Sequence, residues 1–236
     1  MRRSGAAPKR QRNGAKGKPV TVADWRTFEP LELPATLAGA LDAFWQHGYH
    51  GTTVRDIARR VGVTVPALYY HHENKQAMLI ALLEGAMAEV LQRARAADAD
   101  GNGRVLDRFV NVTECVVLHM TYRQPLAGLD TELRYLEPAN RKHYARLRKE
   151  LEDLLVEILK QGVSEGFFDI DSVPGTARAL LGMWQSVTNW YHADGPMSPE
   201  DVTDQYVIIS LHAVGARLRP ARNRDVSSAT TRLTVT

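Results

Sequence analysis

TTVRDIARRVGVTVPALYYHHENK, residues 52–75, is the stretch that decides the fold. Its first half places apolar side chains at i, i+3, i+4 and i+7, the spacing of one buried helical face. These side chains are Val54, Ile57, Ala58 and Val61. Thr53 opens a Thr-x-x-Asp capping box, and Gly62 is the residue type that ends helices in the left-handed conformation. The pattern predicts a short helix between Thr53 and Gly62.

A second short helix is predicted after a tight turn. Thr64 can cap it, and Pro66 fits its first turn, where no backbone donor is needed. Leu68 points inward, which leaves a polar and aromatic tip. Asn74 can then cap a third helix. A helix–turn–helix with a polar tip is the geometry that enters a DNA major groove, although a helical hairpin without a ligand shares this periodicity.

The same stretch resembles the N-terminal domain of TetR-family transcriptional repressors over roughly residues 33–83. The resemblance rests on many positions at fixed spacing without gaps, and it departs from the usual pattern at His72. The matching positions are Gly48-Tyr49, Gly51-Thr52-Thr53-Val54-Arg55-Asp56-Ile57-Ala58, Gly62-Val63-Thr64, Leu68-Tyr69-Tyr70-His71 and Lys75.

The resemblance implies an all-α homodimeric repressor that binds a palindromic DNA operator and responds to a small-molecule effector. We expect the helix-turn-helix domain at residues 21–84 and an effector-binding and dimerisation domain at 85–218. In this family the last two helices, here near 174–192 and 199–218, pack against a second subunit. The segment 129–136 is similar to subfamilies associated with acyl-CoA metabolism, so an acyl-CoA or a hydrophobic acid is the expected effector.

The expected DNA contacts lie on the helix-turn-helix. Val65, Tyr69 and Tyr70 would face the groove, while threonines, His71 and Lys75 would hold phosphates, which set register and salt dependence. The full expected set is Thr52, Thr53, Thr64, Val65, Tyr69, Tyr70, His71 and Lys75.

Candidate effector contacts are polar or aromatic residues on otherwise apolar helices, because small-molecule pockets combine apolar walls with a few polar groups. Each could equally be a satisfied core or surface residue. The candidates are Glu114, His119, Tyr122, Arg134, Trp184 and Asn189.

Composition excludes several classes of protein. The chain has 236 residues, 44% of them hydrophobic, which suffices for one or two globular domains. Cys115 is the single cysteine, which fits a reducing cytoplasm, and no apolar run approaches the ~20 residues of a membrane span. The net charge of +3 conceals a basic arm, because residues 1–20 hold seven basic residues and no acid. We expect this arm and residues 219–236 to be disordered.

Helical periodicity predicts the remaining elements, and we see no convincing strand. A helix should run from Pro34 to Gly48, and a long one should follow Lys75 up to the loop at 98–103. Further helices are expected near 104–122, 125–135, 138–163, 174–192 and 199–218.

Three apparent chemical motifs lack the context that their chemistry needs. Residues 98–103 begin like a calcium loop, but Phe109 stands where a bidentate carboxylate is required. Ser164 lies in a Gly-x-Ser-x-Gly pattern that follows a helix instead of a strand. His71 and His72 are adjacent and cannot easily share a metal. We therefore expect no catalytic residue, metal or cofactor. The alternatives are a helical ligand-binding or activator-type module with weak DNA binding and, least favoured, a small helical hydrolase.

Overall fold

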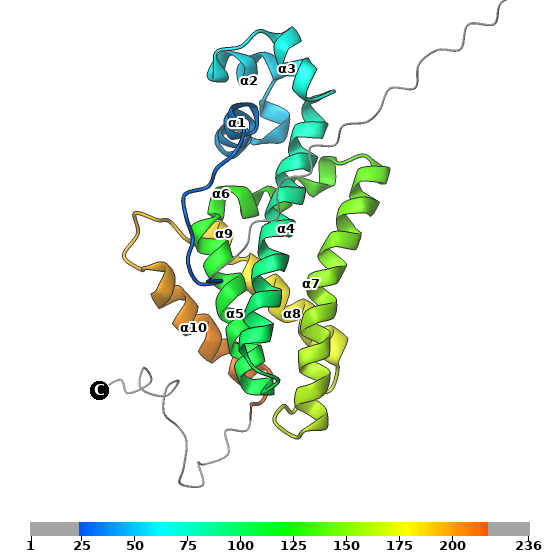
Figure 1. Cartoon of the computed structure of the whole chain (residues 1–236), viewed down its shortest axis with the longest axis vertical. Helices are drawn as coiled ribbons and strands as arrows, with labels where there is room; N and C mark the ends of the chain where they lie inside the picture. Colours follow the sequence, from blue (N-terminus) through cyan, green and yellow to red (C-terminus); the bar gives the residue numbers. More distant parts are fainter. Residues whose placement is uncertain (1–23, 217–236) are drawn as a thin grey trace, which may run out of the picture.

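The computed structural model describes residues 24–216, and all regular structure in that range is helical (Figure 1). The expected arm at 1–20 and tail at 219–236 lie outside the described residues. In chain order the elements are α1 (Ala35–Gly51), α2 (Val54–Val61), α3 (Val65–His71), α4 (Lys75–Asp100), α5 (Val105–Tyr122), α6 (Gln124–Ala127), the 3₁₀ helix η1 (Gly128–Tyr135), α7 (Pro138–Ser164), α8 (Val173–Gln185), α9 (Val187–Trp190) and α10 (Pro199–Ala213). Helices α1, α2 and α3 form a head at one end, and the helices after α4 build a body in which α5 lies at the centre.

Local capping sets the limits of the two short helices in the head. The Thr53 hydroxyl accepts from the Asp56 amide at 3.2 Å, and the Asp56 carboxylate accepts from the Thr53 amide at 3.0 Å, which completes the predicted capping box. Gly62 adopts φ 72° at the end of α2, and the Thr64 side chain caps α3. The helix-turn-helix prediction is confirmed in its local detail.

The end of α1 differs from the prediction. The sequence predicted a stop at Gly48, and the backbone does leave the helical region there, with φ 69° and ψ 165°. One further turn then runs to Gly51. The hydroxyl of the buried Thr52 donates to the carbonyl oxygens of Ala43 and Gly48, both at 2.9 Å, and so fixes the direction in which the chain enters α2.

The long helix α4 belongs to both the head and the body. It spans 26 residues, or about 39 Å at 1.5 Å per residue. Met78 and Leu79 are fully buried at its head end, and Ala94 and Ala97 are fully buried at its body end. The predicted domain boundary at 84/85 therefore falls inside one continuous helix.

Residues 24–34 depart from the expectation that they belong to the helix-turn-helix unit. This segment, here called the strap, descends from α1 along the body (Figure 1). Trp25 is 4% exposed, and its indole Nε1 donates to Asp100 Oδ2 at 3.3 Å. Arg26 pairs with Glu114 at 2.9 Å. The strap thus docks on α4 and α5, far from the helix that follows it in sequence.

Four titratable side chains lie beneath the strap, and we call Glu89, Arg93, His119 and Arg123 the arginine cluster. His119 is 1% exposed, and its Nδ1 has no hydrogen-bond partner within residues 24–216. Burial, which outweighs the nearby charge of Glu89, lowers the pKa of His119 to about 4. The histidine is therefore neutral at physiological pH.

The helices of the body are interrupted more often than the periodicity predicted. The expected helix at 125–135 is a short α6 followed by η1. A Cβ at Gly128 would come within 2.9 Å of Trp45 Cζ3, so the glycine permits the close approach of this segment to α1. The expected helix at 174–192 breaks at Ser186 into α8 and α9. The last helix, expected to reach 218, ends at Ala213.

Two exposed glycines offer a matched test of backbone strain. Replacement of Gly62 by Ala should lower the free energy of unfolding by about 1 kcal/mol, because φ is positive there and no neighbour lies within 4 Å to add a clash. The same change at Gly85, which is exposed inside α4, should raise it by up to about 1 kcal/mol. Urea titration of both variants measures the two changes in the free energy of unfolding. Changes of the same sign would contradict the prediction.

Stability should fall with pH because of His119. Between about pH 6.5 and pH 4 the unfolded chain binds a proton at this residue that the folded chain does not. The free energy of unfolding should therefore decrease as the pH falls through that window, by about 3 kcal/mol at pH 4. A His119→Leu variant should lack this pH-dependent decrease in the free energy of unfolding. Urea titrations from pH 7 to 4 measure the slopes, and identical slopes in both proteins would refute the assignment.

Candidate nucleic-acid interface and effector region

The outer face of α3 carries two exposed tyrosines. Leu68 is fully buried, whereas Tyr69 is 47% and Tyr70 is 87% exposed. The Tyr70 and His71 rings meet edge to face at 5.3 Å, which holds them at the end of the helix. Isolated large aromatic groups at the extremity of a domain add nothing to its core, so they are available to a partner. Thr53 and Thr64 are exposed beside them, and Val65 is half-buried.

Two of the expected phosphate ligands are committed to the interior of the head. Thr52 is 1% exposed, and its hydroxyl is bonded to the two carbonyl oxygens described above. Lys75 Nζ donates to the carbonyl oxygens of Tyr49 at 2.6 Å and of Thr52 at 2.7 Å, and it lies 4.1 Å from the centre of the Tyr49 ring. Burial lowers the pKa of Lys75. In contrast to the expectation, neither side chain is presented as a phosphate donor. The Thr52 hydroxyl is held by α1, and Lys75 joins α4 to the end of α1.

Arginines of α2 supply positive charge, although none of them is among the expected DNA contacts. Arg59 is 79% exposed in its side chain and pairs only loosely with Asp56, at 3.3 Å. Arg55 is exposed, and no partner within residues 24–216 holds it. Arg60 instead pairs with Asp42 at 2.6 Å and supports the head. The signal was available, because positions 55 and 59 lie opposite the apolar face of α2.

The six candidate effector residues do not form one pocket. Trp184 is fully buried, and its Nε1 donates to Ser210 Oγ at 2.9 Å. Asn189 and Arg134 are exposed, and they lie on α9 and η1. The structure brings the other three together on the strap side of α5. They are Glu114, His119 and Tyr122.

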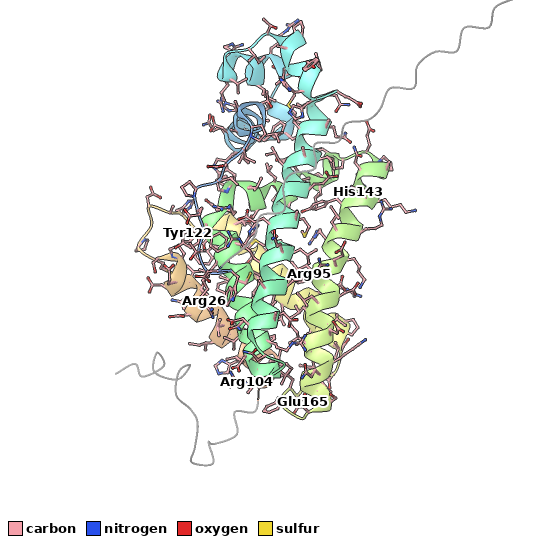
Figure 2. All side chains as sticks on the ribbon, viewed as in Figure 1. Arg26, Arg95, Arg104, Tyr122, His143 and Glu165 are labelled. Carbon is pink, nitrogen blue, oxygen red and sulfur yellow. The ribbon has the colours of Figure 1, made fainter. Side chains whose placement is uncertain are left out.

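The strap covers that face of α5. Tyr122 stacks on the Phe28 ring, with centroids 4.9 Å apart and planes inclined by 11°, and its hydroxyl donates to Glu200 at 2.8 Å. Glu114 accepts two hydrogen bonds from Arg26. Figure 2 shows Tyr122 and Arg26 on this side of the body, with His143 on α7. Strap residues therefore occupy the surface that Glu114, His119 and Tyr122 would offer to a ligand.

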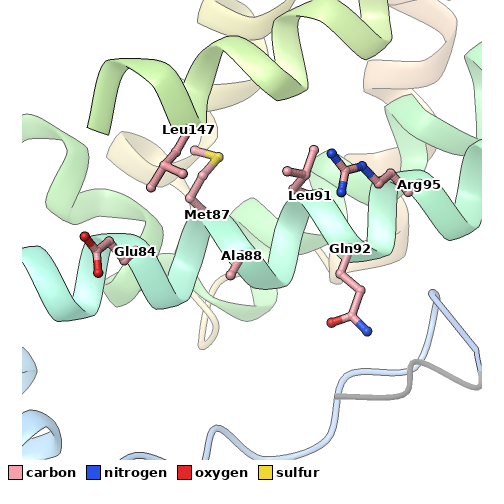
Figure 3. A pocket seen from close by; sticks show the side chains of 7 residues that line it. All are labelled: Glu84, Met87, Ala88, Leu91, Gln92, Arg95 and Leu147. Carbon is pink, nitrogen blue, oxygen red and sulfur yellow. The ribbon is translucent and has the colours of Figure 1, made fainter. Parts of the chain in front are cut away.

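A separate groove of about 330 Å³ lies between α4 and α7 (Figure 3). Met87, Leu91 and Leu147 give it an apolar floor, and Arg95 and Glu84 stand at its two ends. Both end residues pair with α7, Glu84 with His143 and Arg95 with Glu150, each at 2.8 Å. Its volume is at the lower limit of small-molecule sites, and none of the six candidate residues lines it.

Apolar side chains are exposed on the outer side of α9 and α10. Ile208 is 42% and Ile209 is 45% exposed, and Trp190, which is 42% exposed, stacks on Tyr206 with centroids 6.2 Å apart. The opposite side of α10 packs on the body through Val202 and others. Grouped apolar side chains on one surface are typical of an interface with another protein.

The motifs rejected from sequence offer no reactive arrangement within residues 24–216. Ser164 Oγ donates to the Gln161 carbonyl at the end of α7, at 2.9 Å. Burial raises the pKa of the Cys115 thiol to about 12, so it remains protonated. That part of the chain holds no group of three His, Cys, Asp or Glu residues suited to a metal, and none of its helices has the length and hydropathy to cross a membrane.

Comparison with known proteins assigns the fold to a family. Residues 37–82 match the family described as bacterial regulatory proteins, tetR family, and residues 102–214 match the tetracyclin repressor-like C-terminal domain. The chain is 30% identical over 203 residues to the transcriptional repressor KstR2 of Mycobacterium tuberculosis, which covers 80% of this chain and 92% of that protein. It is also 44% identical over 59 residues to the class A tetracycline repressor of Escherichia coli, which covers 25% of this chain and 27% of the repressor.

Solved structures agree with the sequence comparison. The structure of KstR2, a ketosteroid transcriptional regulator of M. tuberculosis, superposes with a TM-score of 0.70 at 26% identity and covers 78% of this chain and 94% of its own. A tetR-family regulatory protein from Rhodococcus RHA1 superposes with a TM-score of 0.74 at 25% identity, and the superposition covers 78% of this chain and 96% of that protein. Both family models together and the KstR2 relative match most of the chain, and its helical fold agrees with the solved structures. This chain therefore belongs to the TetR family of DNA-binding transcriptional regulators.

Proposed function

We propose that the protein is a repressor that binds a palindromic operator as a homodimer and releases it when a small hydrophobic or acyl-CoA-type effector binds. The observation that carries this proposal is the pair of exposed tyrosines on α3, which arginines of α2 flank, in a chain whose relatives are repressors. The two tyrosines, Arg55 and Arg59 are exposed and lie outside the core of the head, unlike Arg60, which pairs with Asp42.

Within the head, the residues divide into two roles. Tyr69, Tyr70 and Val65 enter the major groove and read bases through ring and methyl contacts. Thr64 and His71 lie at the edges of this surface and bind phosphates, together with Arg55 and Arg59, which supply the charge and most of the salt dependence. Thr53 lies beside them, but its hydroxyl donates to Asp56 within the capping box. Thr52 and Lys75 contribute indirectly, because Thr52 fixes the entry of the chain into α2 and Lys75 holds α4 to the end of α1.

The apolar outer face of α9 and α10 is the proposed dimer interface. Trp190, Tyr206, Ile208 and Ile209 would pack against the same face of a second copy, as a twofold axis requires. The pairing sets the distance between the two α3 helices, so that they reach successive major grooves about one helical turn apart.

Effector binding in the body can reach the head through close contacts between α1 and η1. The rings of His50 and Tyr135 meet edge to face at 4.0 Å, and Tyr49 stacks on Tyr135 at 6.0 Å. A ligand that moves α4 or η1 therefore tilts α1 and changes the separation of the paired heads. The likeness to a ketosteroid regulator supports a hydrophobic effector of this kind.

Replacement of Tyr70 by Ala tests the recognition surface. Affinity for DNA from the promoter of the protein's own gene should fall by about tenfold or more, because base contacts of one residue contribute about 1–3 kcal/mol. Thermal unfolding should not change, since the ring is 87% exposed. Fluorescence anisotropy at fixed salt gives the affinity. Val163→Ala, an exposed apolar residue at the far end of α7, is the control, and equal affinity of both variants would refute the assignment.

Arg55→Gln should act differently from Tyr70→Ala. A phosphate contact is independent of sequence, so the variant should weaken specific and nonspecific binding to a similar extent and reduce the slope of log affinity against log salt by about 1. Anisotropy titrations at four salt concentrations measure the slope. An unchanged slope would remove Arg55 from the interface.

Replacement of Ile209 by Glu tests the dimer face. An unpaired charge buried in an interface should raise the dimer dissociation constant by about 100-fold and weaken operator binding with it. Sedimentation velocity across a concentration series reports the association state. Val163→Glu introduces the same charge at a residue that is 40% exposed elsewhere and should stay dimeric. A dimeric Ile209→Glu protein would place the interface on another face.

A further inference from the structure

The arginine cluster carries an unbalanced positive charge in a buried place. Glu89 accepts from Arg93 Nε at 3.2 Å and pairs with Arg123 Nη2 at 3.0 Å. Burial alone would raise the pKa of Glu89, but the hydrogen bond from Arg123 and the neighbouring positive charges lower it. Since His119 is neutral, one carboxylate faces two guanidinium groups. Their side chains are only 6% and 8% exposed, so solvent compensates little of the excess.

Main-chain oxygens accept all the hydrogen bonds that these arginines donate to the strap, and the one strap carboxylate near Arg93, that of Asp24, acts on it through charge without a hydrogen bond. Arg93 Nη1 donates to the carbonyl oxygens of Thr27 at 2.8 Å and of Trp25 at 3.2 Å. Arg123 Nη2 donates to the carbonyl oxygen of Glu29 at 2.8 Å. A carbonyl oxygen bears only a partial charge, whereas a carboxylate forms shorter and stronger hydrogen bonds with a guanidinium. The arginines would therefore bind an anion more strongly than they bind the strap.

Phe28 fills a slot with aromatic and cationic walls. Its ring centre lies 4.0 Å from the Arg93 guanidinium carbon and 5.3 Å from that of Arg123. The ring stacks on Tyr122 and lies tilted against His119, with centroids 6.4 Å apart. The slot thus holds a flat ring by stacking and cation–π attraction, with hydrogen-bond donors beside it.

One polar group of the slot has no partner in residues 24–216. The strap occupies the arginines, yet the buried Nδ1 of His119 makes no hydrogen bond. Buried polar atoms without partners are rare in folded proteins. A ligand oxygen in the slot would supply the partner that Phe28 cannot.

We propose that the arginine cluster and the Phe28 slot form a binding site for an aromatic carboxylate, and that the strap is its built-in competitor. The ligand's ring takes the place of Phe28, and its carboxylate takes the places of the strap carbonyls on Arg93 and Arg123. The strap can leave because it has no helix or strand of its own and Trp25 is its only buried residue. The proposal names a class of effector, and it depends on the proposed repressor function only for the consequence at the operator.

The first experiment is a titration of the full chain with 3-phenylpropionate by isothermal calorimetry, without DNA. Phe28→Ala should bind about tenfold more tightly than the wild type, because the competing ring is gone. The neutral 3-phenyl-1-propanol should bind at least about tenfold more weakly than the carboxylate, since it cannot pair with the arginines. Equal affinity of wild type and Phe28→Ala, or of acid and alcohol, would overturn the proposal.

Variants of the arginines separate the site from nonspecific uptake. Arg123→Gln, combined with Phe28→Ala, should lose the gain in affinity, whereas Arg95→Gln, on the opposite side of α4, should retain it. Arg93→Lys keeps the positive charge but loses the planar fork of the guanidinium. This variant should therefore fold, and it should bind 3-phenylpropionate more weakly than the wild type. Retained affinity in both cluster variants would refute the site. If Arg123→Gln does not fold, Arg93→Lys and the Phe28→Ala gain decide the question.

Hydrogen–deuterium exchange locates the ligand on the intact protein. Saturating 3-phenylpropionate should increase exchange in residues 24–34, because the strap is displaced, and leave α10 unchanged. Binding without increased exchange of the strap would place the ligand elsewhere and overturn the proposal. Since these readouts involve no DNA, their failure is distinct from failure of the repressor assignment, which the Tyr70 variant decides.

Discussion

Burial of α4 along its whole length is the constraint on which the rest of the structure depends. Its first turns pack beneath the head through Met78 and Leu79, and its last turns pack in the body through Ala94 and Ala97. A continuous helix transmits a tilt from one end to the other, because its backbone hydrogen bonds resist bending. The head therefore cannot change its angle while α4 stays in place. The hydrogen bonds from Lys75 to the end of α1 extend this constraint to the helices that contact DNA.

The parts of the fold that could be predicted from sequence are those whose causes are local. Thr53, Gly62 and Thr64 act within three or four residues, so the limits of α2 and α3 follow from the sequence alone. The strap could not be predicted in this way. Its position is set by Arg93 and Arg123, which lie more than 60 residues away and read in sequence as ordinary solvated charges on amphipathic helices. The path of η1 under α1 could not be predicted from local sequence either, because it depends on the approach of Gly128 to Trp45, which lies far away in the sequence.

The residues of the candidate sites also differ in whether their exposure has a local or a nonlocal cause. Tyr69 and Tyr70 are exposed because Leu68 is buried, and that relation is a matter of helical period. The motif predicts an outward side chain at Thr52, whereas carbonyl oxygens of the preceding helix hold its hydroxyl inward. A polar or aromatic residue type on an apolar helix does not distinguish a core indole such as Trp184 from a residue that faces a ligand. Pocket residues are defined by what surrounds them, and the sequence does not contain that information.

The docked strap gives the body a second connection to the head, because it continues directly into α1. One connection, α4, is a rigid helix, and the other is an extended segment that Arg93 and Arg123 hold at carbonyl oxygens. A ligand changes an equilibrium only through its different affinities for the two states. Direct competition for the arginine cluster supplies such a difference, since strap and ligand cannot occupy it together. Coupling between the body and α1 can then arise from the loss of one connection, without strain carried through the core.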